Sequence, residues 1–565
     1  MITPEESPLI LASKKVLPTL APDYYLDNFQ LLMDSVRRLY GDLLTSEELE
    51  FSHGFFAMSG DARRLYVRLL SRRGPAFREL ELAYAEITDI PAAVTELEIA
   101  GFVSGVDCVD LSELSRLYRK AEIASIFADT VALRPGESKR AMLAVIGEMG
   151  LSEDQLFNVC QSWRPERVVV PAHQDTMVVI KLLFFGNQHQ SLTDFVLSDL
   201  GVNRFYPYLL DHEQRLFESR AMIDEYLSLV LLRLRYSEWL EVGSNEDELL
   251  ELAVELVTSR DGSRFSGRWY RFNNRVARQL ERCSRLEAAL NIYAFTPQHP
   301  ARERAARICY GQEKYEGAAA ICDLIEKKPF SEEELEFSQR FRPRIQRKLK
   351  LVPIAPAADV FQEVRLVLSK NGRGVEARIA EYYADRGDAT FFVENGLMNG
   401  LFGLAFWREI FAGLPGVFVN AYQFVPLDMY SPNFFRRREE LLERRMAELR
   451  SNAVVSLLAD YDEFEGYANG WVNWQLLTRS LVETALARIP VEHLEAIWRR
   501  ILFDPRANRS GFPDLIQFPS AGGYRMVEVK GPGDSLQNNQ KRWLRFFQRH
   551  QIPSLVAFVR WQDEI

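Results

Sequence analysis

Cysteine is scarce in this chain of 565 residues, and its distribution excludes one class of site. The cysteines form no CxxC pair and no Cys/His cluster with the spacing of a zinc site. We therefore expect no zinc finger, and we expect free, mostly structural thiols in a reducing compartment. The five cysteines are Cys108, Cys160, Cys283, Cys309 and Cys322.

Long apolar runs and an export signal are also missing. No stretch of about 18 apolar residues is free of charge, so a membrane-spanning helix is not expected. The first residues, MITPEESPLILASKK, place acids before a short apolar stretch and lack the basic start of a signal peptide. We expect a protein that is neither exported nor inserted into a membrane.

The chain has no excess of positive charge. Its formal net charge is −10 and its pI is about 5.5, which excludes a protein that coats nucleic acid through bulk electrostatics. A polyanionic partner would have to meet local basic patches. With 47% apolar and 26% charged residues, the chain is expected to fold nearly throughout. Its length predicts about three to five domains, or fewer if one is a helical array.

Helical periodicity dominates the first 350 residues. The pattern predicts a helical domain over residues 1–105, with a basic edge, and short helices at 111–117 and 139–146, the second opening with Lys139 and Arg140. A plain helical hairpin packed on the preceding segment is favoured for 106–165 over a small DNA-docking module, in which Lys139 and Arg140 would contact DNA.

A β-containing segment and a helical array are predicted next. Strands are expected at 167–171, 176–185 and 194–199, within a small segment spanning 166–210. Amphipathic helices joined by short turns return over 211–355, for example at 304–309 and 311–325, and predict a helical solenoid. A connector rich in proline and alanine at 351–358 is the best candidate boundary in the chain.

Arginine is concentrated in one stretch. Eight arginines and two acids, Asp261 and Glu281, occur between residues 260 and 285. From Arg268 onward the arginines recur at intervals of three and four residues, on one face of a helix. Like charges at this spacing destabilise a helix, so the stripe predicts an anionic partner. Pairing with acids on neighbouring helices, such as those at 332–336, is the alternative. The predicted DNA-contacting residues of the stripe are Arg268, Arg271, Arg275, Arg278 and Arg282.

The C-terminal region carries the chemistry. Residues 513–518 and 524–530 predict two strands of a hairpin, followed by a Gly-Pro-Gly break, a helix capped by Asp534 or Ser535, and a last strand at 554–561. Glu528 and Lys530 share one face of the second strand, because residues two apart in a strand point the same way. Asp514, at the start of the first strand, can reach the same spot.

Two carboxylates and an amine at one place predict a metal-dependent hydrolase. The acids repel each other unless a cation lies between them, and hard oxygen ligands favour Mg²⁺ or Mn²⁺. Such an ion can activate a water molecule against a phosphodiester, and Lys530 can orient that water or neutralise charge at phosphorus. In the following helix Gln540 points inward among apolar residues, where we expect it to position the water or the lysine rather than to serve structure alone.

These motifs resemble those of a known family. The segment GFPDLIQF…YRMVEVKGPGDSLQNNQKRWL resembles the virus-type replication-repair nuclease (VRR-NUC) domain of the PD-(D/E)xK superfamily. The resemblance extends to FFVENGLMNGLFGLAFWREIF, VFVNAYQFVPLDMYSPNFFRRR, GRWYRF and RLYVRLLSRR, a set similar to a bacterial member of the Fanconi-associated nuclease family.

The resemblance implies a mostly helical multidomain chain. Its parts would be an N-terminal DNA-binding region with a SAP-like module at 106–165, a TPR-like helical domain at 211–355, and a C-terminal α/β nuclease domain of restriction-endonuclease-like fold at 356–565. It implies a 5′-flap endonuclease and 5′→3′ exonuclease that acts on branched DNA in interstrand-crosslink repair. The ubiquitin-binding zinc finger of animal members is not expected. The location would be cytoplasmic, with the nucleoid, or nuclear in a eukaryote.

The resemblance also assigns roles to single residues. Asp514, Glu528, the Val529 carbonyl and Glu394 would hold the metal, with Lys530 catalytic and Gln540 the helix residue of the motif. A solvated loop or cap acid is the alternative for Glu394. Arg506, eight residues before Asp514, matches a basic residue that holds the terminal phosphate of a flap. Asn539 stands where some members have lysine, which weakens that part of the phosphate pocket.

Two other functions are compatible with these residues. A Holliday-junction resolvase or restriction-type nuclease could use the same core on a different DNA. A non-catalytic helical scaffold that binds DNA is the second alternative, although the complete set of two acids and a lysine favours an enzyme.

Overall fold

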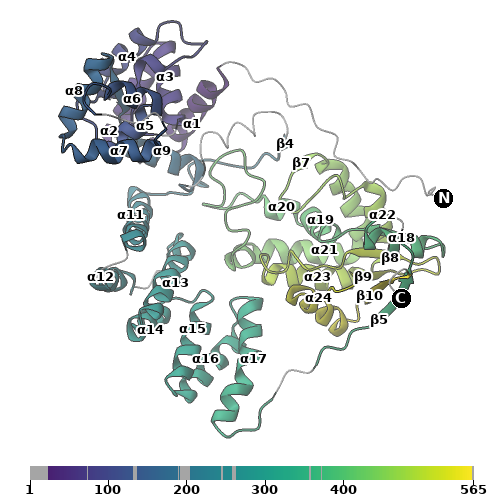
Figure 1. Cartoon of the computed structure of the whole chain (residues 1–565). Helices are drawn as coiled ribbons and strands as arrows, with labels where there is room; N and C mark the ends of the chain where they lie inside the picture. Colours follow the sequence, from purple (N-terminus) through teal and green to yellow (C-terminus); the bar gives the residue numbers. More distant parts are fainter. Residues whose placement is uncertain are drawn as a thin grey trace. The chain divides into compact units, whose positions relative to one another are not determined.

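A computed structural model of the chain describes residues 23–562, except for 73, 132–135, 189, 191–203, 243–245, 258–262, 355–357 and 371. It divides into two compact units (Figure 1). The first comprises residues 1–203 and 215–220, and the second comprises residues 204–214 and 221–565. The predicted strand at 194–199 lies outside the described residues.

The first unit is a helical domain built on a small sheet. A capping box at Thr45, whose side chain accepts from Glu48 N while Glu48 reaches back, starts the second helix. The sheet has the order β1-β3-β2 and is antiparallel throughout. Its elements are α1 (Tyr24–Tyr40), α2 (Ser46–Ala57), α3 (Gly60–Ser71), β1 (Phe77–Arg78), η1 (Glu79–Glu81), α4 (Ile90–Ile99), β2 (Val103–Gly105), β3 (Val168–Pro171) and α9 (Gln174–Phe185).

The strand predicted at 176–185 is wrong, because these residues form helix α9. Its run of β-branched and aromatic residues resembles a buried strand. The run is buried on nearly every side of the helix, and α9 packs against α1 and α2. A helix enclosed on all sides loses the one-sided periodicity by which sequence patterns reveal it.

Four short helices between β2 and β3 form a module with an apolar core of its own. Val109, Leu114, Ile123, Ile146 and Leu156 meet in this core. The prediction of two helices packed on the preceding segment is therefore corrected: the helices at 120–126 and 153–163 were missed, and the module buries its own apolar residues. Its helices are α5 (Leu111–Leu117), α6 (Lys120–Ile126), α7 (Lys139–Glu148) and α8 (Glu153–Trp163).

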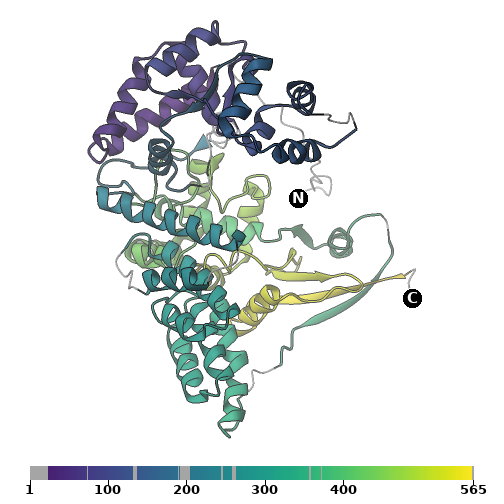
Figure 2. The same ribbon diagram turned by 60° about the vertical axis from the view of Figure 1, so that its left-hand side comes forward.

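The second unit contains the predicted helical array, in which consecutive helices from α12 to α17 pack against one another (Figure 2). The helix expected at 311–325 starts at Tyr315, after a turn in which Glu313 has a positive φ of 61°. The array consists of α11 (Arg220–Val242), α12 (Glu246–Leu256), α13 (Ser266–Arg282), α14 (Leu286–Ala294), α15 (Ala301–Gly311), α16 (Tyr315–Lys327) and α17 (Glu332–Lys348).

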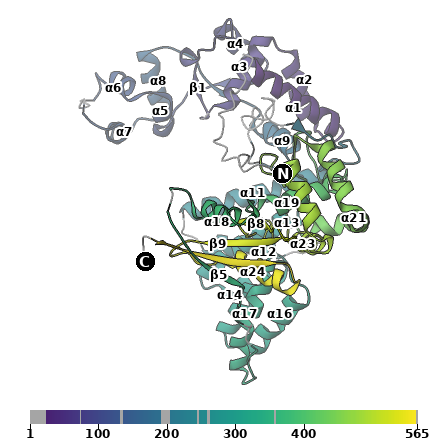
Figure 3. The ribbon, with the colours of Figure 1, turned by 90° about the vertical axis from the view of Figure 1, so that its right-hand side faces the viewer.

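A five-stranded mixed sheet follows, in the order β5-β10-β9-β8-β6 (Figure 3). Strands β6, β8 and β9 are antiparallel neighbours, whereas β10 runs parallel to both β9 and β5. The predicted hairpin and last strand are confirmed, and two strands and a helix before them were missed. The elements are β5 (Glu363–Leu368), α18 (Val375–Ala384), β6 (Ala389–Phe392), β8 (Leu515–Phe518), β9 (Arg525–Lys530), α24 (Asn538–Arg549) and β10 (Ser554–Trp561).

A helical insertion separates β6 from β8. Its large core includes Trp407, Trp498 and Phe402 and continues onto one face of the sheet through Ile516 and Met526 and onto α24 through Trp543. Strand β4 (Arg204–Phe205) pairs with β7 (Tyr467–Ala468) of the insertion. Its helices are α19 (Gly396–Ala405), α20 (Trp407–Ile410), α21 (Asn433–Phe464), α22 (Arg479–Arg488) and α23 (Val491–Phe503).

No helix within the described ranges is both long and apolar enough to cross a bilayer.

Candidate active site and nucleic-acid interface

The β8–β9 hairpin brings Asp514 and Glu528 together. Leu515 pairs with Val527 in the antiparallel register, so Asp514, one residue earlier, lies opposite Glu528. Val527 and Val529 pack in the apolar cluster with α18, while Met526 packs on the opposite face. Glu528 and Lys530 share the face of Met526, as the alternation of the strand predicts.

Short contacts fix the three groups. Lys530 Nζ lies 2.9 Å from Glu528 Oε1, and both side chains are buried. The backbone N–H of Val529 donates to Asp514 Oδ2 at 2.8 Å. Both carboxylate oxygens of Glu528 are buried, and apart from Lys530 no described residue donates a hydrogen bond to them. The strand thus supplies a buried acid whose oxygens are still available to a ligand.

The electrostatics of the hairpin favour a bound cation. Burial, together with the negative charge of Asp514, raises the pKa of Glu528 to about 7, although the ammonium of Lys530 opposes this shift. Burial also raises the pKa of Asp514, while the Val529 N–H and Lys530 lower it. The charges of Glu394 and Glu376 raise the pKa of Asp514 further. Carboxylates that repel one another in this way are stabilised by a positive ion between them.

Two backbone hydrogen bonds, which we call the clasp, join residues 393 and 394 to Asp514. The N–H groups of Val393 and Glu394 donate to the Asp514 carbonyl oxygen at 2.9 and 3.1 Å, just beyond the end of β6. The Glu394 side chain is exposed, yet its charge raises the pKa of both Asp514 and Glu528. The structure therefore places Glu394 at the edge of the same acidic site.

Asn395, which the sequence did not single out, holds this arrangement in place. Its Nδ2 donates to Glu394 Oε1 at 3.2 Å, and its Oδ1 accepts from the Phe512 N–H at 3.1 Å. Asn395 has a φ of 51°, the left-handed region that asparagine tolerates better than most residues. The signal in the sequence was an asparagine beside the predicted acid and directly before a helix.

Gln540 occupies a different place from the predicted one. The helix starts at Asn538 and is capped by Gln537 rather than by Asp534 or Ser535, and Gln540 Oε1 accepts from Gln537 N at 2.8 Å in a capping box. The side chain is half-buried and serves the helix start. The structure thus gives its amide oxygen a structural partner, and no described contact joins Gln540 to Lys530 or the acids.

The helix start lies close to the hairpin. Gly511 has a φ of 92°, and a Cβ added there would come within 2.8 Å of the Asn539 backbone. Only glycine permits both this conformation and this approach. The close packing brings α24 against the segment that leads into Asp514.

The donor set at the hairpin suits a divalent metal. In the parts of the chain that are described, no three Asp, Glu, His or Cys side chains form a preassembled metal cluster. Asp514, Glu528 and Glu394 nevertheless offer oxygen ligands only, which Mg²⁺ and Mn²⁺ accept together with water. The carboxylate oxygens of Glu528 are buried and contact only Lys530 among the described residues, so they are suited to bind such a metal ion.

The predicted arginine stripe lies on α13. The opposite face of this helix is buried through Phe272, Val276 and Leu280, so Arg271, Arg275, Arg278 and Arg282 are exposed. Among these four exposed arginines, the only ion pair with a described residue is that of Arg278 with Glu281 at 2.6 Å.

Acids at 332–336 do not neutralise the stripe. Glu332 pairs with Arg500 and Glu334 with Arg302. Glu333 lies near His299, and Glu336 lies near Arg542 and Arg545. The alternative of pairing between these acids and the stripe is therefore wrong for the four exposed arginines. Arg268 differs from them, since its Nη1 donates to the Tyr226 hydroxyl at 2.7 Å.

Arg271 and Arg506 line a common groove of about 1270 Å³. Arg436, Arg542 and Asn539 line the same groove, beside the start of α24. Desolvation in this wall and the charges of Arg268, Arg506 and Arg233 lower the pKa of Arg271 to about 10. The guanidinium groups that line this groove repel one another, and an anion bound among them would reduce the repulsion.

The side chain of Lys139 stabilises the end of a helix in the first unit. Its Nζ donates to the carbonyl oxygens of Ser115 and Tyr118 at 2.5 and 2.7 Å, where α5 ends. Arg140 is exposed. Of the two residues predicted to contact DNA here, only Arg140 has an exposed side chain.

Comparison with known proteins identifies the family. Two family models match the chain, the VRR-NUC domain over residues 450–561 and the FAN1 HTH domain over residues 23–104. The Fanconi-associated nuclease 1 homolog of Pseudomonas aeruginosa is 33% identical, over 96% of each chain. The chain belongs to the Fanconi-associated nuclease family. It is therefore a DNA nuclease, and a divalent metal ion is the cofactor that membership implies.

A solved structure of a relative agrees with this fold. The crystal structure of paFAN1 bound to 2-nucleotide 5′-flap DNA with a gap is 34% identical, covers 96% of this chain and 100% of its own, and has a TM-score of 0.83. Human Fanconi-associated nuclease 1 is 24% identical over 94% of this chain, which spans 62% of the human protein. The VRR-NUC match omits β5 and β6, which are strands of the same sheet, and the helix α18 between them.

Proposed function

We propose that this nuclease uses Mg²⁺ or Mn²⁺ to cut the 5′ strand of flap DNA, as a structure-specific endonuclease and a 5′→3′ exonuclease. The observation that carries the proposal is the meeting of Asp514, Glu528 and Lys530 at the end of the β8–β9 hairpin. The relative paFAN1, whose structure holds 5′-flap DNA, supports the choice of substrate.

Asp514, Glu528 and Glu394 would hold the metal through their carboxylates, with the main-chain carbonyl of Val529 as a further ligand. A bound divalent ion supplies Lewis acidity toward the phosphodiester and lowers the pKa of a bound water. Lys530, fixed by Glu528 at 2.9 Å, keeps an ammonium group beside the acids. There it can hold the attacking water or neutralise charge at phosphorus.

The arginines of α13 and the groove beside α24 would position the DNA. Phosphate contacts carry no sequence code, so they select DNA by shape and by ends. Arg506 and Arg271 face the groove and would hold phosphates of the displaced strand, with Arg275 and Arg282 contacting the duplex. Asn539 offers a neutral amide there, and we propose a weaker grip on a terminal phosphate than a lysine would give.

Release of a strand next to a junction is a step that interstrand-crosslink repair requires, and we propose this role for the enzyme. Its place would then be with the chromosome, in the cytoplasm of a bacterium. The predicted domains at 106–165 and 211–355 would serve as SAP-like and TPR-like supports for the bent duplex.

End-labelled 5′-flap, nicked, gapped and four-way DNAs, incubated with Mg²⁺, Mn²⁺ or Ca²⁺, test the proposal. We expect cleavage near the flap junction in Mg²⁺ and Mn²⁺, and its loss in Asp514→Ala and Glu528→Ala with flap binding in Ca²⁺ retained. Glu492→Ala, an exposed acid of α23, is the matched control. Cleavage retained in Asp514→Ala would refute the site, and paired symmetric cuts in four-way DNA would favour a resolvase.

A further inference from the structure

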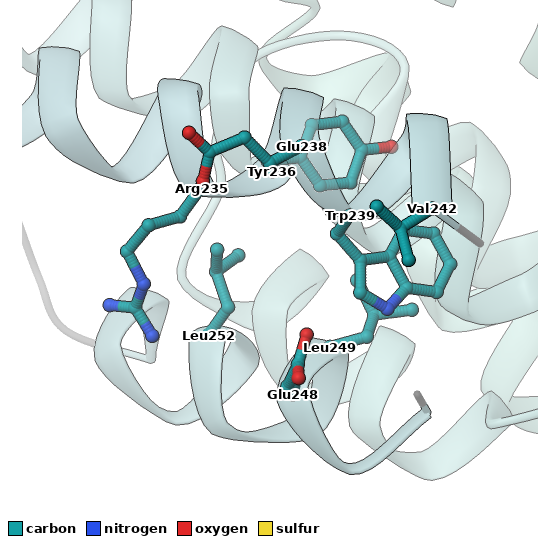
Figure 4. A pocket seen from close by; sticks show the side chains of 8 residues that line it. All are labelled: Arg235, Tyr236, Glu238, Trp239, Val242, Glu248, Leu249 and Leu252. Carbon is teal, nitrogen blue, oxygen red and sulfur yellow. The ribbon is translucent and has the colours of Figure 1, made fainter. Parts of the chain in front are cut away.

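One surface of the helical array differs from the rest. Helices α11 and α12 enclose a hollow of about 370 Å³, with Tyr236, Trp239, Leu249 and Leu252 among its walls. Figure 4 shows the Trp239 indole beside Val242 at one end of this hollow and Leu252 near its other end. This volume falls at the lower end of the roughly 300–1,000 Å³ of ligand pockets and suits one or two large side chains.

Large apolar side chains are exposed on the two helices that form the hollow, and one of them, Val242, lines it. Among the described residues of α11 and α12, five large apolar side chains are exposed, with Val242 at 76% and Val254 at 74%. Over residues 266–348, a longer stretch that holds α13–α17, the exposed large apolar residues are Phe295 and Leu324. Such a concentration of exposed apolar surface is typical of a binding site. The five are Leu231, Leu234, Leu240, Val242 and Val254.

The rim of the hollow is acidic. Seven acids and one base lie between Arg235 and Leu256, and all seven acids are exposed. The base, Arg235, already pairs with Glu255 at 2.9 Å. Glu238 and Glu248 stand at the hollow itself. A surface of this sign repels phosphate, so DNA, which meets the basic face of α13, is not the ligand here.

We propose that the hollow between α11 and α12 binds a short amphipathic helix of a partner protein, which presents one or two large apolar side chains flanked by lysine or arginine. The walls are two helices and offer no open strand edge, so a helix laid in the groove is the fitting mode of recognition. Apolar anchors would fill the hollow, and basic flanks would face the carboxylate rim. This site is separate from the nuclease chemistry.

Selection from a displayed library of helical peptides tests the proposal. Peptides of about 15 residues, long enough to form a helix, are selected on the full-length protein and counter-selected on a triple variant, Glu238→Lys, Glu248→Lys and Val242→Asp. These side chains are exposed, so the variant should fold, and thermal unfolding checks this. The matched control reverses two exposed acids elsewhere in the array, Glu287→Lys and Glu316→Lys.

We expect enriched peptides with apolar residues at helical spacing and basic flanks. One such peptide, labelled and followed by fluorescence anisotropy, should bind the triple variant at least tenfold more weakly and the control variant as well as the wild type. Enrichment of acidic or polar peptides, or equal binding to the folded triple variant, would overturn the proposal. Displacement of the peptide by 5′-flap DNA would assign the face to DNA, and loss of a dimer in the variant would assign it to a second copy; both outcomes contradict the proposal.

Discussion

Replacement of Asn395 separates the positioning of Glu394 from the stability of the fold. Its Nδ2 bond to Glu394 Oε1 at 3.2 Å holds a proposed metal ligand, and its Oδ1 bond to Phe512 N at 3.1 Å holds the segment before Asp514. A hydrogen bond to a charged group contributes about 1.5–3 kcal/mol, which corresponds to about 10–100-fold in metal affinity. The measurable quantity is the Mn²⁺ concentration that half-saturates flap cleavage.

Three substitutions distinguish the contributions. Asn395→Gly keeps the positive φ of 51° at no steric cost, so it should raise the Mn²⁺ requirement about 10–100-fold with a modest loss of stability. Asn395→Ala should add about 1–2 kcal/mol of backbone strain to the same metal defect. Asn395→Asp keeps an acceptor for Phe512 N but replaces the donor, so its melting temperature should stay near that of the wild type while its metal requirement rises.

Cleavage rates against Mn²⁺, calorimetric Mn²⁺ binding and thermal unfolding in EDTA form the assay. Binding by calorimetry does not depend on turnover, so it reports on the ligand set directly. A wild-type Mn²⁺ requirement in both Asn395→Gly and Asn395→Asp would refute the reasoning, because Asn395 would then serve only the backbone at the start of α19.

Three further outcomes are expected. In EDTA, Glu528→Gln should be more stable than the wild type by up to about 3 kcal/mol at pH 8 and equal to it near pH 4. The reason is that folding raises the pKa of Glu528 from 4.5 to about 7, so the folded wild type loses stability as the pH rises through this window. A difference in unfolding free energy that does not change with pH would contradict this. Lys530→Ala should lower turnover about 10²–10⁴-fold with flap affinity in Ca²⁺ unchanged, and a defect confined to affinity would speak against its catalytic role. The double variant Arg275→Glu and Arg282→Glu should reduce the slope of log affinity against log salt by about 2, whereas Arg344→Glu in α17, exposed but off the stripe, should leave it unchanged.

The sequence predicted the β8–β9 hairpin well because its signals are local. The strands at 515–518, 525–530 and 554–561 lie within the predicted ranges, and alternation alone placed Glu528 and Lys530 on one face. The start of α24 was missed, because Asp534 and Ser535 are also good caps and the choice of Gln537 depends on the reciprocal bond with Gln540. Local patterns do not decide between competing caps.

Other errors came from the tertiary environment. Exposed and buried residues alternate along strand β5, but the strand joins the sheet only by pairing with β10, which lies at the far end of the chain. Helix α9 resembled a strand because it is buried nearly all round. The commitment of Lys139 to the end of α5 depends on two carbonyl groups that no periodicity reveals. In each case the deciding contact joins residues that are distant in sequence or invisible to a one-sided pattern.

The clasp between Glu394 and Asp514 explains how one site can tolerate a large insertion. The contact is made by backbone groups, since the Val393 and Glu394 N–H groups donate to the Asp514 carbonyl, so it does not depend on which side chains the insertion carries. The insertion that carries helices α19–α23 begins directly after Glu394 and ends directly before Asp514, and its core continues onto the sheet through Ile516 and Met526. The two ends of the insertion are therefore fixed to each other at the site itself. Changes within the insertion can alter how DNA is held without moving the acids apart, whereas loss of the clasp would separate them even if every helix stayed folded.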